Sequence, residues 1–139
     1  MKRLLTALTV VAVFAASSFA GVQDFGAFTI NVPEGWTATK DGATVGIVKN
    51  DNTASASITV DSADGASAKE LADAFVSELN GKNLQTMEGG YQFEFDNQNG
   101  VTSKAFISEQ NGKYALIVVT GLENAPEEIS KMIDSLQEK

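Results

Sequence analysis

The chain has 139 residues, eighteen of them acidic and ten basic, which gives a formal net charge of −8 at pH 7. This acidity argues against nucleic acids and anionic lipid headgroups as partners, because binding phosphates depends on cationic side chains. The sequence contains no His and no Cys, which removes the usual base of Ser and Cys hydrolases, thiolate nucleophiles and thiolate metal sites.

The first twenty residues have the three parts of a secretory signal. Residues 1–3 are positively charged, residues 4–16 are almost wholly apolar, and residues 17–20 place small side chains where a signal peptidase reads the chain. The apolar run is shorter than the roughly 20 residues that span a membrane. We therefore predict a cleavable signal peptide at 1–20 and one exported domain at 21–139, periplasmic or secreted; an uncleaved anchor is the alternative.

Loss of the signal peptide would make the exported domain more acidic still. Without Lys2 and Arg3, eight basic residues, all of them Lys, stand against eighteen acidic ones, and the formal net charge becomes −10. Such a charge favours solubility, and it offers no basis for binding a membrane surface once the signal is removed.

The first half of this domain alternates apolar and polar residues with the period of a half-buried strand. The pattern predicts strands over residues 28–32, 36–40, 44–48 and 56–60. Three groups of turn residues separate them: Pro33-Glu34-Gly35, Asp41-Gly42 and Asn50-Asp51-Asn52. We expect these strands to form one antiparallel meander.

A helix is expected next, because Ser67 and Glu70 have the spacing of a capping box. Apolar residues then recur at helical spacing on one face: Ala68, Leu71, Ala72, Phe75 and Leu79. Asn80-Gly81 ends the helix, and we expect Gly81 to take the left-handed conformation there.

The second half returns to strands and closes with another helix. Alternation and turn dipeptides predict strands over residues 83–87, 91–95, 101–108 and 114–120, and Pro126 marks the first turn of a helix whose inward stripe runs from Ile129 to Leu136. Residues 114–120 form the most apolar run, which is typical of a central strand buried on both faces. The fold class is therefore α+β, built on an antiparallel sheet with a helix on each side.

Several of these segments resemble the PsbP-like superfamily, which is named for a lumenal subunit of photosystem II and includes exported bacterial relatives. The resemblance rests on Phe28-x-Ile30-x-Val32-Pro33-x-Gly35-Trp36, on the capped helix over 67–79 and on the final Met132-Ile133-Asp134-Ser135-Leu136. It implies an α/β/α sandwich with a central antiparallel sheet. It implies no activity, because members include photosystem accessory subunits, a regulator of a nuclear transport GTPase and bacterial envelope proteins. Some bacterial relatives are lipoproteins, but this chain lacks the lipid-modified Cys.

Three aromatic residues are candidate ligand or partner contacts: Trp36, Tyr91 and Tyr114. Trp anchors many interfaces, and a Tyr hydroxyl at a strand start can reach a partner. The alternative is that Trp36 seals one end of the core and that the two Tyr residues are core residues with solvated hydroxyl groups.

We predict no cofactor, and calcium is the alternative that we consider. Asp61 and Asp64 lie in an oxygen-rich loop that ends at Gly65, and residues 96–100 form a second such loop. Calcium takes six to eight oxygen ligands and is available outside cells. Turn chemistry explains the same Asp, Asn and Gly residues without a metal.

These observations favour a non-enzymatic exported accessory or binding module that docks on another envelope protein or complex. The alternative is a carrier of a small molecule or calcium, held in a cleft between sheet and helix. A hydrolase that uses only carboxylates is a third possibility, since glycosidases need two acids, but eighteen acidic residues make some such pair inevitable.

Overall fold

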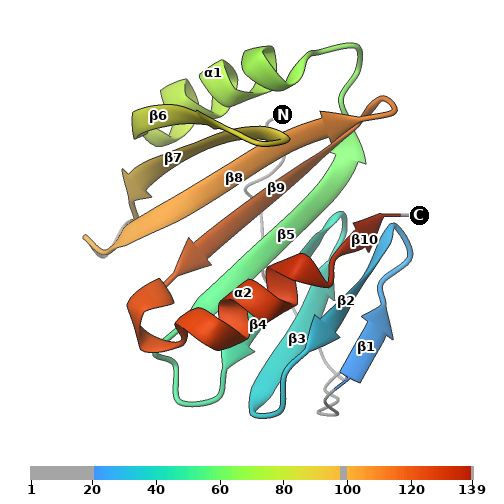
Figure 1. Cartoon of the computed structure of the whole chain (residues 1–139), viewed down its shortest axis with the longest axis vertical. Coiled ribbons are helices and arrows are strands. Elements are labelled where there is room, and N and C mark those ends of the chain that lie inside the picture. Colours follow the sequence, from blue (N-terminus) through green and yellow to red (C-terminus); the bar gives the residue numbers. More distant parts are fainter. Residues whose placement is uncertain (1–20, 98–99, 139) are drawn as a thin grey trace.

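The computed structural model describes residues 21–97 and 100–138, so the predicted signal peptide at 1–20 lies outside the described residues (Figure 1). Strands dominate this part of the chain, with two α-helices and one short 3-10 helix between them. In chain order the elements are β1 Gly21–Asp24, β2 Phe28–Val32, β3 Trp36–Asp41, β4 Thr44–Lys49, β5 Ser55–Ser62, α1 Ala68–Leu79, β6 Lys82–Met87, β7 Gly90–Asp96, β8 Thr102–Gln110, β9 Lys113–Thr120, η2 Leu122–Asn124, α2 Pro126–Asp134 and β10 Gln137–Glu138.

Seven strands form one large antiparallel sheet in the order β3-β4-β5-β9-β8-β7-β6. β9 is the middle strand, as its apolar sequence predicts. Its residues alternate between the two faces of the sheet, and both sets are buried: Tyr114 and Leu116 belong to one apolar cluster, and Ala115, Ile117 and Val119 belong to the other. The α+β class and the antiparallel sheet are therefore confirmed.

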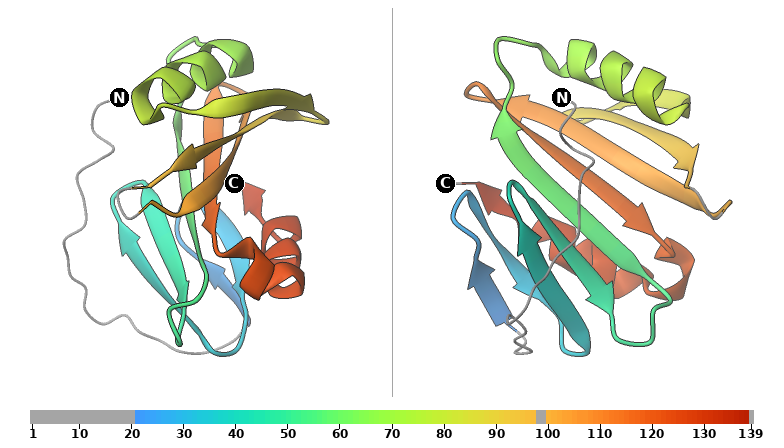
Figure 2. Two further views of the ribbon diagram at one scale, coloured as in Figure 1. Left: turned by 90° about the vertical axis from the view of Figure 1, so that its left-hand side faces the viewer. Right: turned by 180° about the vertical axis from the view of Figure 1, so that it is seen from behind.

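The two helices cover opposite faces of the sheet and different halves of it. α1 places Leu71, Ala72 and Phe75 against β7 and β8, while α2 places Ile129 and Met132 in the cluster of β4, β5 and β9. Figure 2 shows this staggered arrangement, with α1 and α2 on opposite sides of the sheet. One half of each face consequently has no helix over it in the part of the chain that the structure describes.

The prediction of one meander for the first half is wrong for β2. This strand is not part of the large sheet; it is the middle strand of a second, three-stranded sheet in the order β1-β2-β10. The turn after β2 redirects the chain, with Gly35 at φ +88° and the N–H of Trp36 donating to the carbonyl of Pro33 at 3.2 Å. The Ser135 hydroxyl accepts from the N–H of Asn31 at 2.8 Å and fixes the C-terminal segment beside β2.

The capping box at the start of α1 is confirmed. The Ser67 hydroxyl accepts from the N–H of Glu70 at 3.2 Å, and the Glu70 carboxylate accepts from the N–H of Ser67 at 3.0 Å. The prediction for the other end is wrong by one residue, because Asn80 takes the left-handed conformation at φ +59°. Gly81 is needed for space instead: a Cβ there would lie 2.6 Å from the ring of Phe93.

Replacing Ser67 by Ala should lower the free energy of unfolding by about 1 kcal/mol, because the backbone N–H of Glu70 loses its hydroxyl acceptor at the start of the helix. Urea denaturation followed by circular dichroism measures this loss. Ser77→Ala is the matched control: it makes the same change at an exposed position inside α1, where the better helix propensity of Ala should leave stability unchanged or slightly raised. Equal losses in the two variants would contradict the role of the cap.

The loop between β4 and β5 packs against the end of β9. Its Asp51 accepts hydrogen bonds from the hydroxyl and the N–H of Thr53, at 2.6 and 3.1 Å, and these hold the pKa of Asp51 below its ordinary value of 3.8. This contribution to stability is present above pH 3.8 and is lost as the pH falls further. The carbonyl of Thr53 in turn accepts from the Asn124 amide at 2.8 Å, which joins the loop to the segment after Gly121.

Candidate binding groove

The sheet face opposite α1 is open over β6, β7 and β8. Cross-strand pairs lie side by side on it, with Gln92 opposite Phe106 and Glu94 opposite Lys104. All four side chains are half-buried, and Phe106 also packs against the cluster under α2. The open face therefore presents one aromatic ring within a polar surface.

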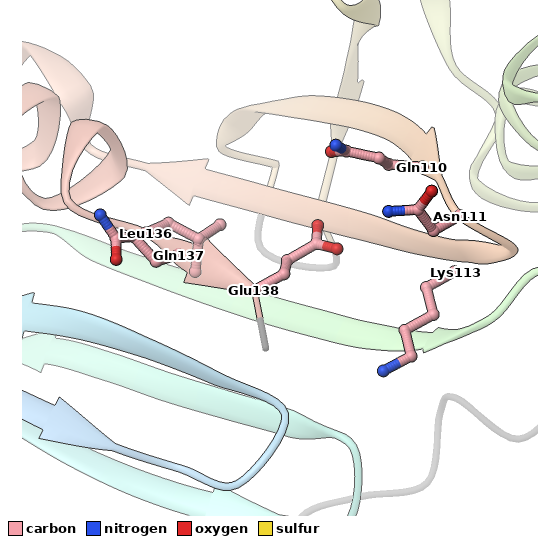
Figure 3. Close-up of a pocket in the computed structure, with 6 residues that line it drawn as sticks. All are labelled: Gln110, Asn111, Lys113, Leu136, Gln137 and Glu138. Carbon is pink, nitrogen blue, oxygen red and sulfur yellow. The ribbon is translucent and has the colours of Figure 1, made fainter.

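At the edge of this face, the β8–β9 hairpin and the segment after α2 flank a solvent-open pocket of about 660 Å³ (Figure 3). We call this pocket the groove; it is lined by Gln110, Asn111, Lys113, Leu136, Gln137 and Glu138. Its two walls are far apart in the sequence. Pairing between Gln110 and Lys113 fixes one wall, and pairing of β10 with β2 fixes the other.

The groove is rich in hydrogen-bonding groups of both kinds. Three side-chain amides can donate and accept, the Lys113 ammonium only donates, and the ionised Glu138 carboxylate only accepts. Figure 3 shows Glu138 reaching from the C-terminal segment toward the β8–β9 hairpin. Leu136 adds a half-buried apolar side chain that packs against the core. This lining suits a ligand with several polar groups, such as an extended peptide segment or a small polar molecule.

The structure does not bring the three predicted aromatic contacts together. Trp36 is 2 % exposed in the cluster under α2, and Tyr114 is 5 % exposed in the cluster under α1, where its ring lies 5.9 Å from that of Phe75. Both face the core because their strand positions point toward a helix-covered half of the sheet, so a contact role does not fit either side chain. Tyr91 is half-buried beside the α1 cluster and does not line the groove.

The predicted calcium ligands lie in a turn that uses their oxygens locally. Asp61 accepts from the N–H of Ser62 at 2.8 Å, and Asp64 accepts from the Ser62 hydroxyl at 3.0 Å, with Asp64 itself at φ +54°. No group of three or more His, Cys, Asp or Glu side chains that could hold a metal occurs among the described residues. The second loop, 96–100, lies partly outside them. Calcium binding stays a prediction.

Comparisons with known proteins bear on the fold. No family model and no curated protein matches the chain. A crystal structure from Bacteroides thetaiotaomicron VPI-5482 is similar, with a TM-score of 0.56 and 17 % sequence identity over 89 % of this chain. The chain spans about half of that protein, 48 % of its length, and at this identity the likeness shows the fold alone. Within residues 21–97 and 100–138, no helix has the length and apolar character needed to cross a membrane.

Proposed function

We propose that this protein is a non-enzymatic accessory module of an exported compartment, which docks on another envelope protein or complex. The docking surface is the open face of β6, β7 and β8 together with the groove at its edge. The single observation that carries the proposal is that this half of the sheet has no helix over its face, has the half-buried Phe106 on that face, and ends in a polar groove.

This arrangement has the anatomy of a modest protein interface. A buried aromatic residue surrounded by polar groups is where binding energy concentrates, while the polar rim gives orientation. The groove supplies that rim from Gln110, Lys113 and Glu138. Because the exported domain carries a net charge of −10, the partner surface should be basic, and its association should slow as salt is added.

The absence of Cys from the chain makes the proposal directly testable by crosslinking. Gln110→Cys places a reactive thiol at the groove, and Thr39→Cys places one at an exposed position on β3. With a thiol-directed photocrosslinker in the native envelope, the Gln110→Cys protein should give one discrete adduct that the Thr39→Cys protein does not give.

A charge reversal then identifies the groove as the cause. In the Gln110→Cys background, Glu138→Lys should remove most of the adduct, because it places a cation opposite a basic partner. Glu127→Lys makes the same change on the exposed surface of α2 and should leave the adduct in place. An adduct that survives Glu138→Lys, or the same adduct from Thr39→Cys, would refute docking at the groove.

The groove also favours a second candidate function, a carrier of a small molecule. Its volume falls within the range of roughly 300–1,000 Å³ that is usual for ligand pockets. A ligand that binds only the folded protein raises the melting temperature by mass action. A polar compound that stabilises the native protein but not the Glu138→Lys variant, with no protein adduct from Gln110→Cys, would favour the carrier over the docking module.

We also propose that the fold is the PsbP-like α/β/α sandwich that the sequence resembles. A PsbP-like α/β/α sandwich is supported by the central antiparallel sheet and by the burial of β9 under residues of both helices. The three-stranded sheet beside α2 is an addition that the resemblance does not imply. Export is supported by the pattern of residues 1–20 in the sequence.

A further inference from the structure

β6 is the longest element of the described chain in which every residue is exposed. All six of its residues are exposed, including the apolar Leu84 at 37 % and Met87 at 38 %. It lies at the edge of the large sheet and pairs only with β7, while α1 packs on β7 and β8. Figure 1 shows β6 as the outermost strand at the α1 end of the sheet. An open edge of this kind is a template for another strand.

The hairpin that joins β6 to β7 fixes which backbone groups point outward. Met87 pairs with Gly90 across a two-residue turn, so these two residues form a hydrogen-bonded pair. Antiparallel pairs alternate between hydrogen-bonded and non-hydrogen-bonded, so the next pair, Thr86 and Tyr91, is not hydrogen-bonded. The N–H and C=O of Thr86 therefore face the open edge. The β6–β7 register shifts between Lys82 and Gln85, where Asn83 has φ +60°, so the regular alternation ends there. The C=O of Leu84 still faces the open edge, because it lies on the same trans peptide as the N–H of Gln85, which points to β7, and the extended backbone of Leu84 turns its own N–H the same way.

We propose that β6 pairs in antiparallel fashion with β6 of a second copy of this chain, with Gln85 on the two-fold axis. In this register Leu84 of each copy lies opposite Thr86 of the other, and all four outward-facing backbone groups of these two residues on each chain find partners. The occupant of the edge is a second copy because the strand is complementary to itself.

Charge selects this register over its neighbours. With Gln85 on the axis, the Lys82 end of one strand meets the Glu88 end of the other, and the two-fold symmetry creates two such opposite-charge contacts. Sliding one strand by two residues in either direction keeps the outward groups paired but separates Lys82 from Glu88. Opposite charges at both ends of a short ladder therefore fix its alignment.

The geometry leaves room for both copies of α1. Because α1 lies over β7 and β8, the two helices would be separated by the spacing from β7 through both β6 strands to the second β7, roughly 14 Å at about 4.8 Å per strand. A helix is about 10 Å across, so they do not collide. The Leu84 side chains of the two copies are diagonal neighbours in this register and fill the space between the helices.

The interface should be weak and salt-sensitive. It contains one short ladder. Two copies of the domain 21–139, each with a formal net charge of −10, also repel one another until salt screens them over a distance of about 8 Å at physiological ionic strength. A dissociation constant between about 1 μM and 1 mM is the expected range for so small a contact. Sedimentation equilibrium of the domain 21–139 over that concentration range measures it.

Charge-swap variants test the register. Glu88→Lys alone and Lys82→Glu alone should each weaken dimerisation at least about tenfold, because each places like charges at the ends of the ladder. The double variant Lys82→Glu with Glu88→Lys restores opposite charges and should recover the dimer. Lys82 also lies 3.6 Å from Asp96, but that ion pair is exposed and contributes little to folding.

Backbone variants test the ladder itself. Thr86→Pro removes an outward N–H that β7 does not use, so it should abolish the dimer and leave the monomer folded by circular dichroism. Thr86→Val keeps the N–H and should leave the dimer intact. A domain that stays monomeric at every concentration, a dimer that survives Thr86→Pro in the folded protein, or a double charge swap that fails to rescue would each overturn the proposal.

Discussion

Gly121→Ala is expected to destabilise this protein by more than about 4 kcal/mol, a loss at the exceptional end of the range for single substitutions. Two independent costs act at the same position. Gly121 has φ +76°, where an Ala is strained by roughly 1–2 kcal/mol. A Cβ there would also lie 2.2 Å from the carbonyl oxygen of Thr53 and 3.0 Å from the Cα of Ala54, both backbone atoms. The loop before β5 would have to move and would release the Asn124 amide.

Two other glycines separate these costs. Gly112 has φ +81° but open space around its missing side chain, so Gly112→Ala should cost only the strain, about 1 kcal/mol. At Gly90, whose φ is not positive, a Cβ would lie 2.1 Å from the carbonyl oxygen of Ile107, so Gly90→Ala should cost the collision alone. Urea denaturation of the three variants should rank Gly121 above both others. If Gly121→Ala lowers the free energy of unfolding no more than Gly112→Ala does, the loop that contains Thr53 can move aside at little energetic cost.

Trp36→Ala should cost about 3–5 kcal/mol, because it empties the space of a large aromatic side chain in a packed core. Trp36 is 2 % exposed and shares its cluster with Phe28 and Met132, so the substitution would leave a buried apolar cavity. Its indole N–H is buried with no hydrogen-bond partner among the described residues. Trp36→Phe keeps most of the ring volume and removes this unpaired donor, so it should cost much less, about 1–2 kcal/mol.

The comparison of the two Trp36 variants is the informative measurement. Circular dichroism must follow the unfolding, since Trp36 is the only Trp in the chain and its fluorescence disappears in both variants. Val22→Ala, at a position that is 73 % exposed, is the surface control and should change stability by less than about 0.5 kcal/mol. If Trp36→Phe proves as costly as Trp36→Ala, the indole N–H has a partner such as a buried water.

Local patterns predict most of the elements of this fold, and long-range pairing accounts for the errors. The capping box at Ser67 and the alternation of the strands depend on neighbours in the sequence, and both are found in the structure. The position of β2 depends on Gln137, which pairs with Thr29 across more than a hundred residues, and on the Ser135 hydroxyl. Two-residue strands such as β10 have no periodicity to detect.

The groove could not be predicted from the sequence, because it too depends on long-range strand pairing. Gln110 and Asn111 have the composition of an ordinary hairpin turn, and Gln137-Glu138 has that of a polar chain end. They become a site only because β2 holds the end of the chain beside the β8–β9 hairpin. In the sequence the aromatic residues are the conspicuous candidates, but Trp36 and Tyr114 fall on inward strand positions. The amide and charged side chains that line the groove do not stand out in the sequence, because such residues are common in turns and at chain ends.

The pairing of β2 with β10 also has a consequence for the order of assembly. Strand partners so distant in the sequence meet late, because the entropy of closing a long loop is lost before their contacts form. In a chain that emerges with residue 21 ahead of residue 138, β1 and β2 can form a hairpin at once. The other edge of β2 stays unpaired until β10, which follows α2, is available to pair with it. The interval before that closure is when the nascent protein is most exposed to aggregation through β2.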